Sequence, residues 1–197
     1  VKGVYAYVTC PMILEKFIKE LKISVPEIKD IPKLPESLNG KRTKTSSLVV
    51  SGDNIILEEY TFEVKVDESC SEFANWISEK IFNIPEMKYW KDKLANDLVI
   101  LSNDDFKDMV NLFTEVITRT KINNETGTVE SGALFTEEFL PQESILYSLV
   151  MASPEFQKEG KKAEKIMELF ESGLKPVFQL GGKATLGKGL LRSVICQ

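Results

Sequence analysis

The sequence contains no histidine and only three cysteines, Cys10, Cys70 and Cys196. Without histidine, the chain cannot build Ser-His-Asp or Cys-His nucleophilic machinery, and it has no histidine for acid–base catalysis or zinc binding. Three cysteines that lie far apart cannot supply a four-cysteine metal site, and scattered thiols of odd number are typical of a reducing, cytoplasmic setting. Any catalysis by these residues would therefore use carboxylates, lysine, tyrosine or a hard metal ion bound by oxygen ligands.

Long apolar runs and arginine are also scarce. No apolar stretch reaches the roughly 18 residues of a membrane span, so we expect no membrane partner. Only three of the 25 basic residues are arginine, and the formal net charge is −5. Because a free-standing binder of duplex DNA is usually basic, this charge argues mildly against that function. A chain of 197 residues with 43% hydrophobic and 28% charged residues is typical of one globular domain.

Glycine is concentrated in one short segment near the end of the sequence. Four of the eleven glycines fall between Gly181 and Gly189, together with Lys183 and Lys188. This density predicts a loop that needs positive φ angles or a close approach of backbone. Exposed backbone N–H groups and lysines commonly hold phosphate oxygens. The candidate phosphate-binding residues are Gly181, Gly182, Lys183, Gly187, Lys188 and Gly189.

The same segment differs from a nucleotide-binding P-loop at one position. Gly182 to Gly189 reads G-x-x-x-x-G-K-G, and Gly189 stands where the P-loop has the Ser or Thr that binds Mg²⁺. A P-loop also follows the first strand of a βα unit, whereas only eight residues follow Gly189. We therefore expect no ATP or GTP hydrolysis. A tight strand-to-strand turn without a ligand remains the alternative interpretation.

The order of apolar and polar residues predicts an α+β fold with prominent antiparallel hairpins. Strands are expected at residues 3–10, 98–101, 144–151, 176–180 and 190–195, with hairpins at 47–66 and 116–139. Helices are expected to start at Pro11, Ser71, Pro85, Asn103 and Ser153, with Asn103 and Ser153 as N-caps and Gly173 at the end of the last helix. We interpret residues 67–108 as a helical insertion in a single domain.

The hairpin at 114–139 is a second candidate site. Strand alternation places Arg119 and Lys121 on one face and Thr118 and Thr120 on the other, next to a turn-rich tip. These donors could contact a phosphate backbone. The alternative is an edge hairpin whose charges keep it soluble, and composition alone favours this alternative.

Two further signals are weaker. Glu137 and Glu138 are expected on opposite faces of a strand, so they do not form an obvious acid–base pair, and a solvated strand end is favoured over a Mg²⁺ site. Tyr5 and Tyr7 share one face of the first strand. Their rings could stack on bases, or they could equally be core or subunit-interface residues.

Several segments carry a family resemblance in chain order: Gly3-Val4-Tyr5-Ala6-Tyr7-Val8-Thr9-Cys10-Pro11, Thr118–Ile122, Thr126–Val129, Gly132–Phe135, Glu137–Pro141 and Gln179–Gly189. Together they resemble the RAMP proteins of type III-B CRISPR (Cmr) effector complexes, in particular the repeated backbone subunit of the filament. The resemblance covers the start of the chain and most of residues 114–197.

The resemblance implies a ferredoxin-like, RRM-related RAMP core across residues 1–197, with the hairpin at 114–139 as a thumb that pushes between guide and target bases. It implies a cytoplasmic, CRISPR guide RNA-binding protein of antiviral defence, whose partners are target RNA, other Cmr subunits and copies of itself. The glycine-rich loop would then line guide phosphates, with Arg119 and Lys121 on the guide or target backbone.

The resemblance also implies a divalent-metal-dependent (Mg or Mn) endoribonuclease activity for the intact protein. The family's cleavage aspartate lies upstream of Gly3, so we expect an N-terminally truncated chain with no catalytic residue and no metal site of its own. Glu138 and Phe139 match a region at or near the family's cleavage site and are weak candidates for supporting roles. The alternative function is a structural or assembly domain without direct RNA contact.

Overall fold

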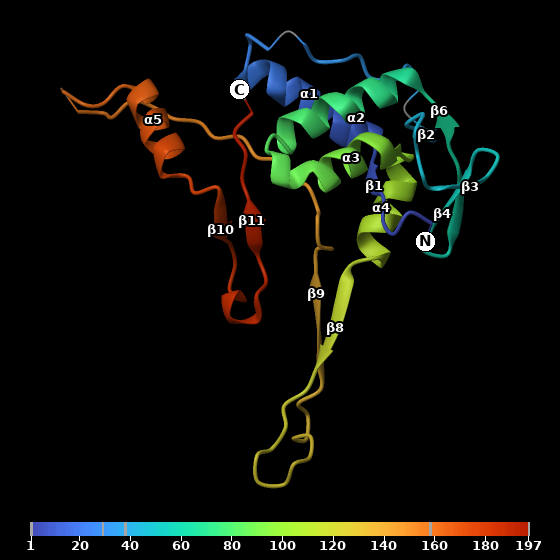
Figure 1. Cartoon of the computed structure of the whole chain (residues 1–197). Coiled ribbons are helices and arrows are strands. Elements are labelled where there is room, and N and C mark those ends of the chain that lie inside the picture. Colours follow the sequence, from blue (N-terminus) through green and yellow to red (C-terminus); the bar gives the residue numbers. More distant parts are fainter. Residues whose placement is uncertain (1, 29, 38, 158, 197) are drawn as a thin grey trace.

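The computed structural model describes residues 2–28, 30–37, 39–157 and 159–196. The helices α1 to α4 and several short strands form a body, and two β-hairpins extend from it (Figure 1). Figure 1 also shows that the longer hairpin, β8–β9, reaches far beyond the body, and that the other hairpin, β10–β11, points in the same direction. The mixture of helices with several small sheets confirms the predicted α+β class.

A four-stranded sheet lies at the centre of the body. Its order is β1 (Tyr7–Thr9), β7 (Leu98–Ile100), β2 (Lys41–Arg42) and β6 (Lys65–Val66). β1 and β7 are parallel, β7 and β2 are antiparallel, and β2 and β6 are parallel. Every residue of β7 is buried, because this apolar strand has a neighbour on both sides. The predicted strand at 98–101 is thus confirmed, and the one at 3–10 is shorter than predicted.

Three helices pack on this sheet: α1 (Pro11–Ser24), α2 (Glu68–Ile81) and α3 (Lys88–Asp97). Pro11 occupies the first turn of α1, where its missing N–H is not needed. Asp67 caps α2 by accepting a hydrogen bond from the Cys70 N–H. A short 3₁₀ helix, η1 (Pro85–Met87), leads into α3. These elements of the 67–108 region are part of the core; that the region is an insertion stays a prediction.

The first-strand tyrosines belong to this helical side of the core. Tyr7 is buried, and Tyr5 packs against the same cluster of side chains. Their rings meet edge to face, with centroids 5.5 Å apart. Burial raises the pKa of both phenols above the ordinary value. The structure therefore places both tyrosines in the core rather than on a base-stacking platform.

A second core cluster lies where a three-stranded antiparallel sheet meets β7. That sheet consists of β3 (Val49–Ser51), β4 (Asn54–Leu57) and β5 (Tyr60–Glu63). Ile55 and Val64 are fully buried beside Val99. The predicted hairpin in residues 47–66 is confirmed. The next helix, α4 (Asn103–Leu112), is capped by Ser102 and not by Asn103 as predicted, because the Ser102 hydroxyl accepts the Asp105 N–H.

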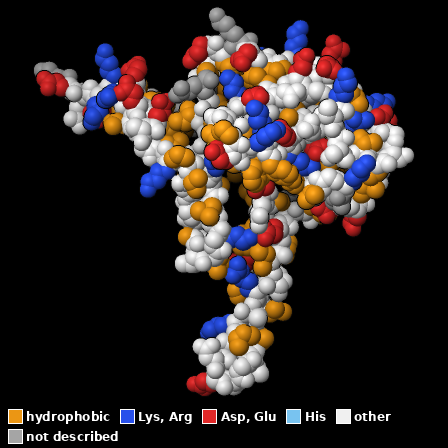
Figure 2. All heavy atoms as spheres, viewed as in Figure 1, with side chains coloured by type: hydrophobic (Ala, Val, Ile, Leu, Met, Phe, Trp, Pro, Cys, Tyr) orange, Lys and Arg blue, Asp and Glu red, His pale blue; other side chains and the backbone are white. Residues whose placement is uncertain are grey.

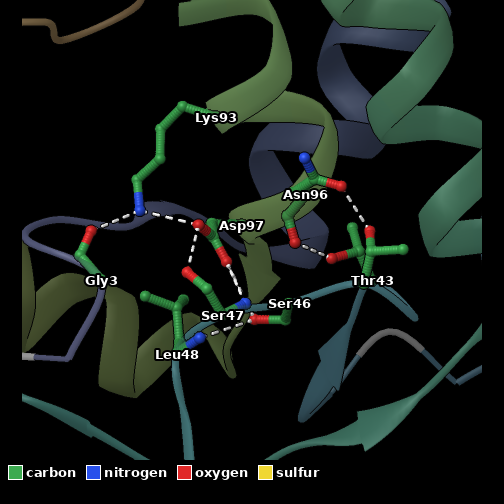
Figure 3. Close-up of polar contacts among 9 residues, drawn as sticks. Gly3, Thr43, Ser46, Ser47, Leu48, Lys93, Asn96 and Asp97 are labelled. Carbon is green, nitrogen blue, oxygen red and sulfur yellow. Dashed lines mark hydrogen bonds and ion pairs between the residues drawn. The ribbon is translucent and has the colours of Figure 1, made fainter. Parts of the chain in front are cut away.

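A buried ion pair ties α3 to a loop and to the start of the described chain (Figure 3). Lys93 Nζ donates to Asp97 Oδ2 at 2.7 Å and to the Gly3 carbonyl at 2.6 Å. Asp97 also accepts from the Ser47 N–H and hydroxyl and from the Ser46 hydroxyl. Every charge in this cluster therefore has several hydrogen-bond partners, which is the condition for burying an ion pair without a large penalty.

Burial ends abruptly after Leu101. In the described ranges 102–157 and 159–196, no residue is buried. These ranges hold α4, β8 (Glu115–Arg119), β9 (Phe135–Phe139), α5 (Ala163–Gly173), β10 (Val177–Gln179), η2 (Ala184–Leu186) and β11 (Leu190–Arg192). Large apolar side chains remain exposed there, among them Leu134, Leu146, Met151, Leu180 and Leu190. Figure 2 shows hydrophobic side chains on the visible surface of both the body and the hairpins.

Two predicted elements in this half are wrong. Residues 144–151 form no strand, because no neighbouring strand pairs with them in the described chain. The last helix begins at Ala163 and not at Ser153, although it ends at Gly173 as predicted. Glu155 and Lys161 explain the late start: the Glu155 N–H donates to the Lys161 carbonyl, and the Lys161 N–H donates to the Glu155 carboxylate, which closes a loop where the helix was expected. No helix among the described residues is long and apolar enough to cross a membrane.

Candidate functional site at the junction of two hairpins

The β8–β9 hairpin divides its side chains between two faces. Glu115 pairs with Phe139, Ile117 with Glu137 and Arg119 with Phe135, so these side chains share one face. Val116, Thr118, Thr136 and Glu138 lie on the other face. The prediction that Glu137 and Glu138 point in opposite directions is confirmed. The first face is the one that meets the second hairpin.

The glycine-rich segment connects the antiparallel strands β10 and β11. Gly189 has φ of 76°, its carbonyl accepts the Leu180 N–H, and a Cβ at this position would collide with the Leu180 carbonyl. The predicted need for positive φ and close approach is therefore met at Gly189. A connection between two antiparallel strands is not the strand-to-helix turn of a P-loop, which agrees with the expectation that the segment does not hydrolyse nucleotides.

The two hairpins meet in a charged cluster that we call the hairpin junction: Glu115, Arg119, Glu137 and Phe139 from β8–β9, with Lys183 and Lys188 from the glycine-rich connection. Lys183 Nζ donates to Glu137 Oε1, and Arg119 Nε lies 2.8 Å from Glu137 Oε2. Lys188 Nζ donates to Glu115 Oε1 at 3.0 Å. In Figure 2, basic and acidic side chains gather where the long hairpin leaves the body.

Glu137 is the electrostatic centre of the hairpin junction. Its side chain is 16% exposed, against 27% for Arg119 and 50% for Lys183. The hydrogen bond from Lys183, together with the Arg119 charge, holds the pKa of Glu137 below its ordinary value, so the carboxylate is ionised at neutral pH. The Arg119 Nε–Glu137 Oε2 contact is an ion pair without hydrogen-bond geometry. One carboxylate thus bridges two cations that come from different hairpins.

Lys188 is held more firmly than Lys183. Its ammonium lies 4.5 Å from the centroid of the Phe139 ring and also pairs with Glu115, and its side chain is only 22% exposed. A cation over an aromatic face and beside a carboxylate is attracted by both. Lys188 therefore attaches the glycine-rich connection to the long hairpin.

Comparison with known proteins assigns this chain to a family. Residues 15–192 match the family model of the RAMP superfamily. The chain belongs to the RAMP superfamily. This RAMP chain is similar to the CRISPR system Cmr endoribonuclease Cmr4 of Pyrococcus furiosus, with 33% identity over 97% of this chain and 62% of that protein. It is also similar, at 24% identity over 95% of its length, to the CRISPR system CMR subunit Cmr4 of Saccharolobus solfataricus, of which it spans 62%.

The solved structures show the same fold. The crystal structure of oligomeric Cmr4 from Pyrococcus furiosus has a TM-score of 0.64 and 24% identity, over 98% of this chain and 65% of that one. A chain in the cryo-EM structure of the type III-B Cmr-beta complex bound to cognate target RNA has a TM-score of 0.54 and 20% identity, over 98% of this chain and 62% of that one. The RAMP chain thus spans less than two thirds of the relatives that it matches.

Not every predicted site residue of the RAMP chain lies at the hairpin junction. Lys121 lies further along the long hairpin and pairs with Glu130 at 2.8 Å. Glu138 is exposed on the opposite face from Arg119. Gly181, Gly182 and Gly187 lie in the connection itself, where the Gly187 and Lys188 N–H groups donate to carbonyls of the same loop. These two backbone N–H groups are therefore already used within the loop.

The other arginines of the RAMP chain have structural roles. Arg192 Nη1 donates to the Ile81 carbonyl at 2.7 Å, and this bond attaches β11 to the end of α2. Arg42 is buried and donates to the Val64 carbonyl and to Asp53. Arg119 is thus the arginine that the fold leaves at the hairpin junction.

The RAMP chain offers no obvious metal site in the part that the structure describes. Among those residues, no group of three or more Cys, Asp or Glu side chains could hold a metal ion. The acidic residues of the hairpin junction are instead paired with lysine and arginine. The residues described do not fit the Mg²⁺ or Mn²⁺ site that the family resemblance implies for cleavage, and we derive no catalytic step through a metal.

Sequence reasoning missed two partners in the hairpin junction. Glu115 was not singled out, and Glu137 was interpreted as part of a solvated strand end. Strand alternation places Glu115 on the face of Arg119, which was a usable signal. The contacts to Lys183 and Lys188 join residues 46 and 73 positions apart, and no local pattern predicts contacts of that kind.

Proposed function

We propose that this RAMP chain is a CRISPR guide RNA-binding backbone subunit of a type III-B effector complex. The observation that carries the proposal is that Arg119 and Lys183 both form ion pairs with Glu137. This arrangement places basic side chains from two hairpins next to each other, and the Lys183 side chain is half exposed. Arginine and lysine are the side chains that contact RNA phosphates most often. The names of the similar proteins, Cmr4 and the type III-B Cmr-beta complex, support the same assignment.

In this proposal the two hairpins have different roles in RNA binding. The glycine-rich connection and Arg119 hold guide phosphates, while the β8–β9 hairpin acts as a thumb that separates guide from target bases, with Lys121 on the backbone near it. The length to which this hairpin extends from the body supports the thumb role (Figure 1). The order β1-β7-β2, with β1 and β7 parallel, supports a ferredoxin-like core around the sheet.

Copies of the chain stack along the guide together with other Cmr subunits. Because each copy repeats the same contacts, weak individual sites add up, and a net charge of −5 is tolerable. The exposed apolar side chains after residue 101 support contacts with neighbouring subunits. In this proposal the complex works in the cytoplasm, and burial of Cys70, which raises the pKa of its thiol to about 12, makes that thiol less reactive.

Target-RNA cleavage belongs in this proposal to the whole protein, with a divalent metal ion. Glu138 and Phe139 remain candidates for supporting roles in that reaction. Phe139 also contacts Lys188, so its substitution would affect binding as well as any cleavage.

The proposal is tested by measuring the affinity of the chain for a fluorescent single-stranded RNA across a salt series. Binding should weaken steeply with salt, and Lys183→Ala should lower the slope of log Kd against log salt by about 0.7, the value for one lost contact to a single-stranded phosphate. Lys175→Ala, which removes an exposed lysine just before β10, should leave the slope unchanged. Salt-independent affinity, or no affinity, would contradict the proposal.

An assembly domain without RNA contact is the second candidate. It is favoured by the lack of burial after residue 101, which leaves a large apolar surface for other subunits. It predicts that the Lys183→Ala/Lys188→Ala variant changes sedimentation behaviour in an assembly assay while RNA affinity is unaffected. The salt series and the sedimentation experiment therefore separate the two functions.

A further inference from the structure

Glu137 bridges two cations of the hairpin junction that come from different hairpins. Each of its two oxygens contacts a different cation: Oε1 accepts from Lys183 and Oε2 lies against Arg119 Nε. Arg119 and Lys183 belong to segments 64 positions apart in the sequence, and they carry the same charge. Without a carboxylate between them, the two cations would repel each other, and Lys183 would lose its contact with the long hairpin.

Both cations keep donors that Glu137 does not use. Arg119 contacts Glu137 through Nε, and within the part of the chain that the structure describes its Nη1 and Nη2 groups make no hydrogen bond. The ammonium of Lys183 has three N–H groups, of which one serves Glu137, and half of this side chain is exposed. A phosphate can therefore bind to Arg119 and Lys183 while Glu137 stays in place.

The second ion pair of the hairpin junction has a different character. Lys188 is only 22% exposed and is occupied by both Glu115 and the Phe139 ring. It leaves less room for a ligand and serves to attach the loop. The ligand-facing pair is therefore Arg119 with Lys183, and the residue that holds them together is Glu137.

We propose that Glu137 is a positioning residue, which links the two hairpins so that Arg119 and Lys183 form a single site for one RNA phosphate. This inference rests on the proposed RNA-binding function. It adds a residue whose negative charge has the same sign as that of RNA. Guanidinium Nη groups suit two phosphate oxygens at once, and the lysine adds a point charge beside them. Glu137 itself does not touch the RNA.

The sign of the effect makes this inference testable. Glu137→Gln removes a negative charge, so the overall field of the protein alone would make RNA binding tighter. A positioning role requires the opposite, because the two cations separate once the bridge is lost. Glu143→Gln is the matched control: Glu143 is an exposed glutamate just after β9, and its substitution changes the net charge by the same amount.

The experiment measures single-stranded RNA affinity by fluorescence anisotropy over a salt series, for the full chain and both variants. Glu137→Gln should weaken binding on the order of tenfold at low salt, as expected for a lost charge-assisted contact, and should lower the salt slope by about 0.7. Glu143→Gln should bind as tightly as the unchanged chain or slightly more tightly. Circular dichroism melts should show that both variants remain folded.

A double-variant cycle adds a result that a purely structural role would not give. If Glu137 acts through Lys183, then Glu137→Gln should have little further effect in a Lys183→Ala background, whereas an independent loss of stability would add to it. Equal affinities for Glu137→Gln and Glu143→Gln, with RNA binding by the unchanged chain intact, would overturn the positioning role alone. Failure of the unchanged chain to bind RNA would overturn the proposed function together with it.

Discussion

The ammonium of Lys188 lies 4.5 Å from the centroid of the Phe139 ring, so a residue of the glycine-rich connection rests on an aromatic side chain of the long hairpin. This contact joins segments that are each too poor in buried side chains to be rigid alone. Together with the ion pairs at Glu115 and Glu137, it couples the motion of the two hairpins.

Phe139→Leu should loosen the glycine-rich connection. The substitution keeps an apolar side chain but removes the ring face, a loss of about 0.5–1 kcal/mol for a cation–π contact near the surface. Trypsin should then cut more rapidly after Lys183 and Lys188, which mass spectrometry of the fragments would show. Phe135→Leu on the same face of β9 is the control, since no lysine is found over that ring among the described residues. Equal cleavage of the two variants would mean that the Lys188 contact does not hold the loop.

Two aspartates of α3 offer a comparison of buried and exposed ion pairs. Asp97 and Lys93 have side chains that are 4% and 7% exposed, whereas Asp92 and Lys88, at the same spacing, are 53% and 76% exposed. Asp97→Ala should lower the free energy of unfolding by about 3–5 kcal/mol, because it leaves a buried ammonium without its partner. Asp92→Ala should change it by less than about 0.5 kcal/mol.

Urea unfolding followed by circular dichroism measures both changes. A small effect of Asp97→Ala would show that water reaches Lys93 and solvates it. The double substitution of Lys93 and Asp97 by leucine should cost less than Asp97→Ala, because it leaves no buried charge unpaired.

Gly189 should tolerate no side chain. Gly189→Ala would place a methyl group against the Leu180 carbonyl at a φ of 76°, where an L-residue alone costs about 1–2 kcal/mol. The Leu180 amide, which donates to the Gly189 carbonyl, should then exchange with solvent more rapidly in a hydrogen-exchange experiment. Gly182→Ala is the matched control, because a Cβ there meets nothing within 4 Å. Protection of the Leu180 amide that is unchanged in Gly189→Ala would contradict the structure of this turn.

The charge of Glu137 should give loop attachment a defined pH dependence. Lys183 and Arg119 lower the pKa of this carboxyl in the folded chain, so its stabilising contribution is present above the pKa of an unfolded glutamate. That contribution is lost as the pH falls through the lower, folded pKa. An NMR titration of the carboxyl carbon should give Glu137 a midpoint below the ordinary value for a glutamate. Lys183→Met should move the Glu137 midpoint upward, and an unchanged midpoint would show that the lysine is not its main partner.

The parts of the fold that were predictable are those that local sequence specifies. The β8–β9 hairpin follows from strand alternation around a turn-rich tip, and α1 follows from Pro11 and its apolar face. The segment 144–151 was predicted as a strand because it is apolar, but a strand also needs a partner, and single-segment patterns contain no information on partners. Ser153 and Pro154 are a valid helix start, yet the Glu155–Lys161 contacts close a loop there instead.

The candidate site was predictable to a similar extent. Residue type and spacing singled out Arg119, Lys183 and Lys188 as phosphate contacts. They did not reveal that acidic residues of the hairpin would pair with them. An ion-pair partner can come from any part of the chain, so sequence spacing does not identify it. Residues far apart in the chain can be assigned as partners only once the register of both hairpins is known.

The end of burial at Leu101 affects how unfolding experiments on this chain should be interpreted. Both tryptophans, Trp76 and Trp90, belong to the helical side of the core. Their fluorescence therefore follows mainly the unfolding of this helical side of the core, which the first half of the chain forms. A substitution at Arg119 or Lys188 could release both hairpins and leave the tryptophan melting curve unchanged. For this molecule, a normal melting curve is evidence about the body alone.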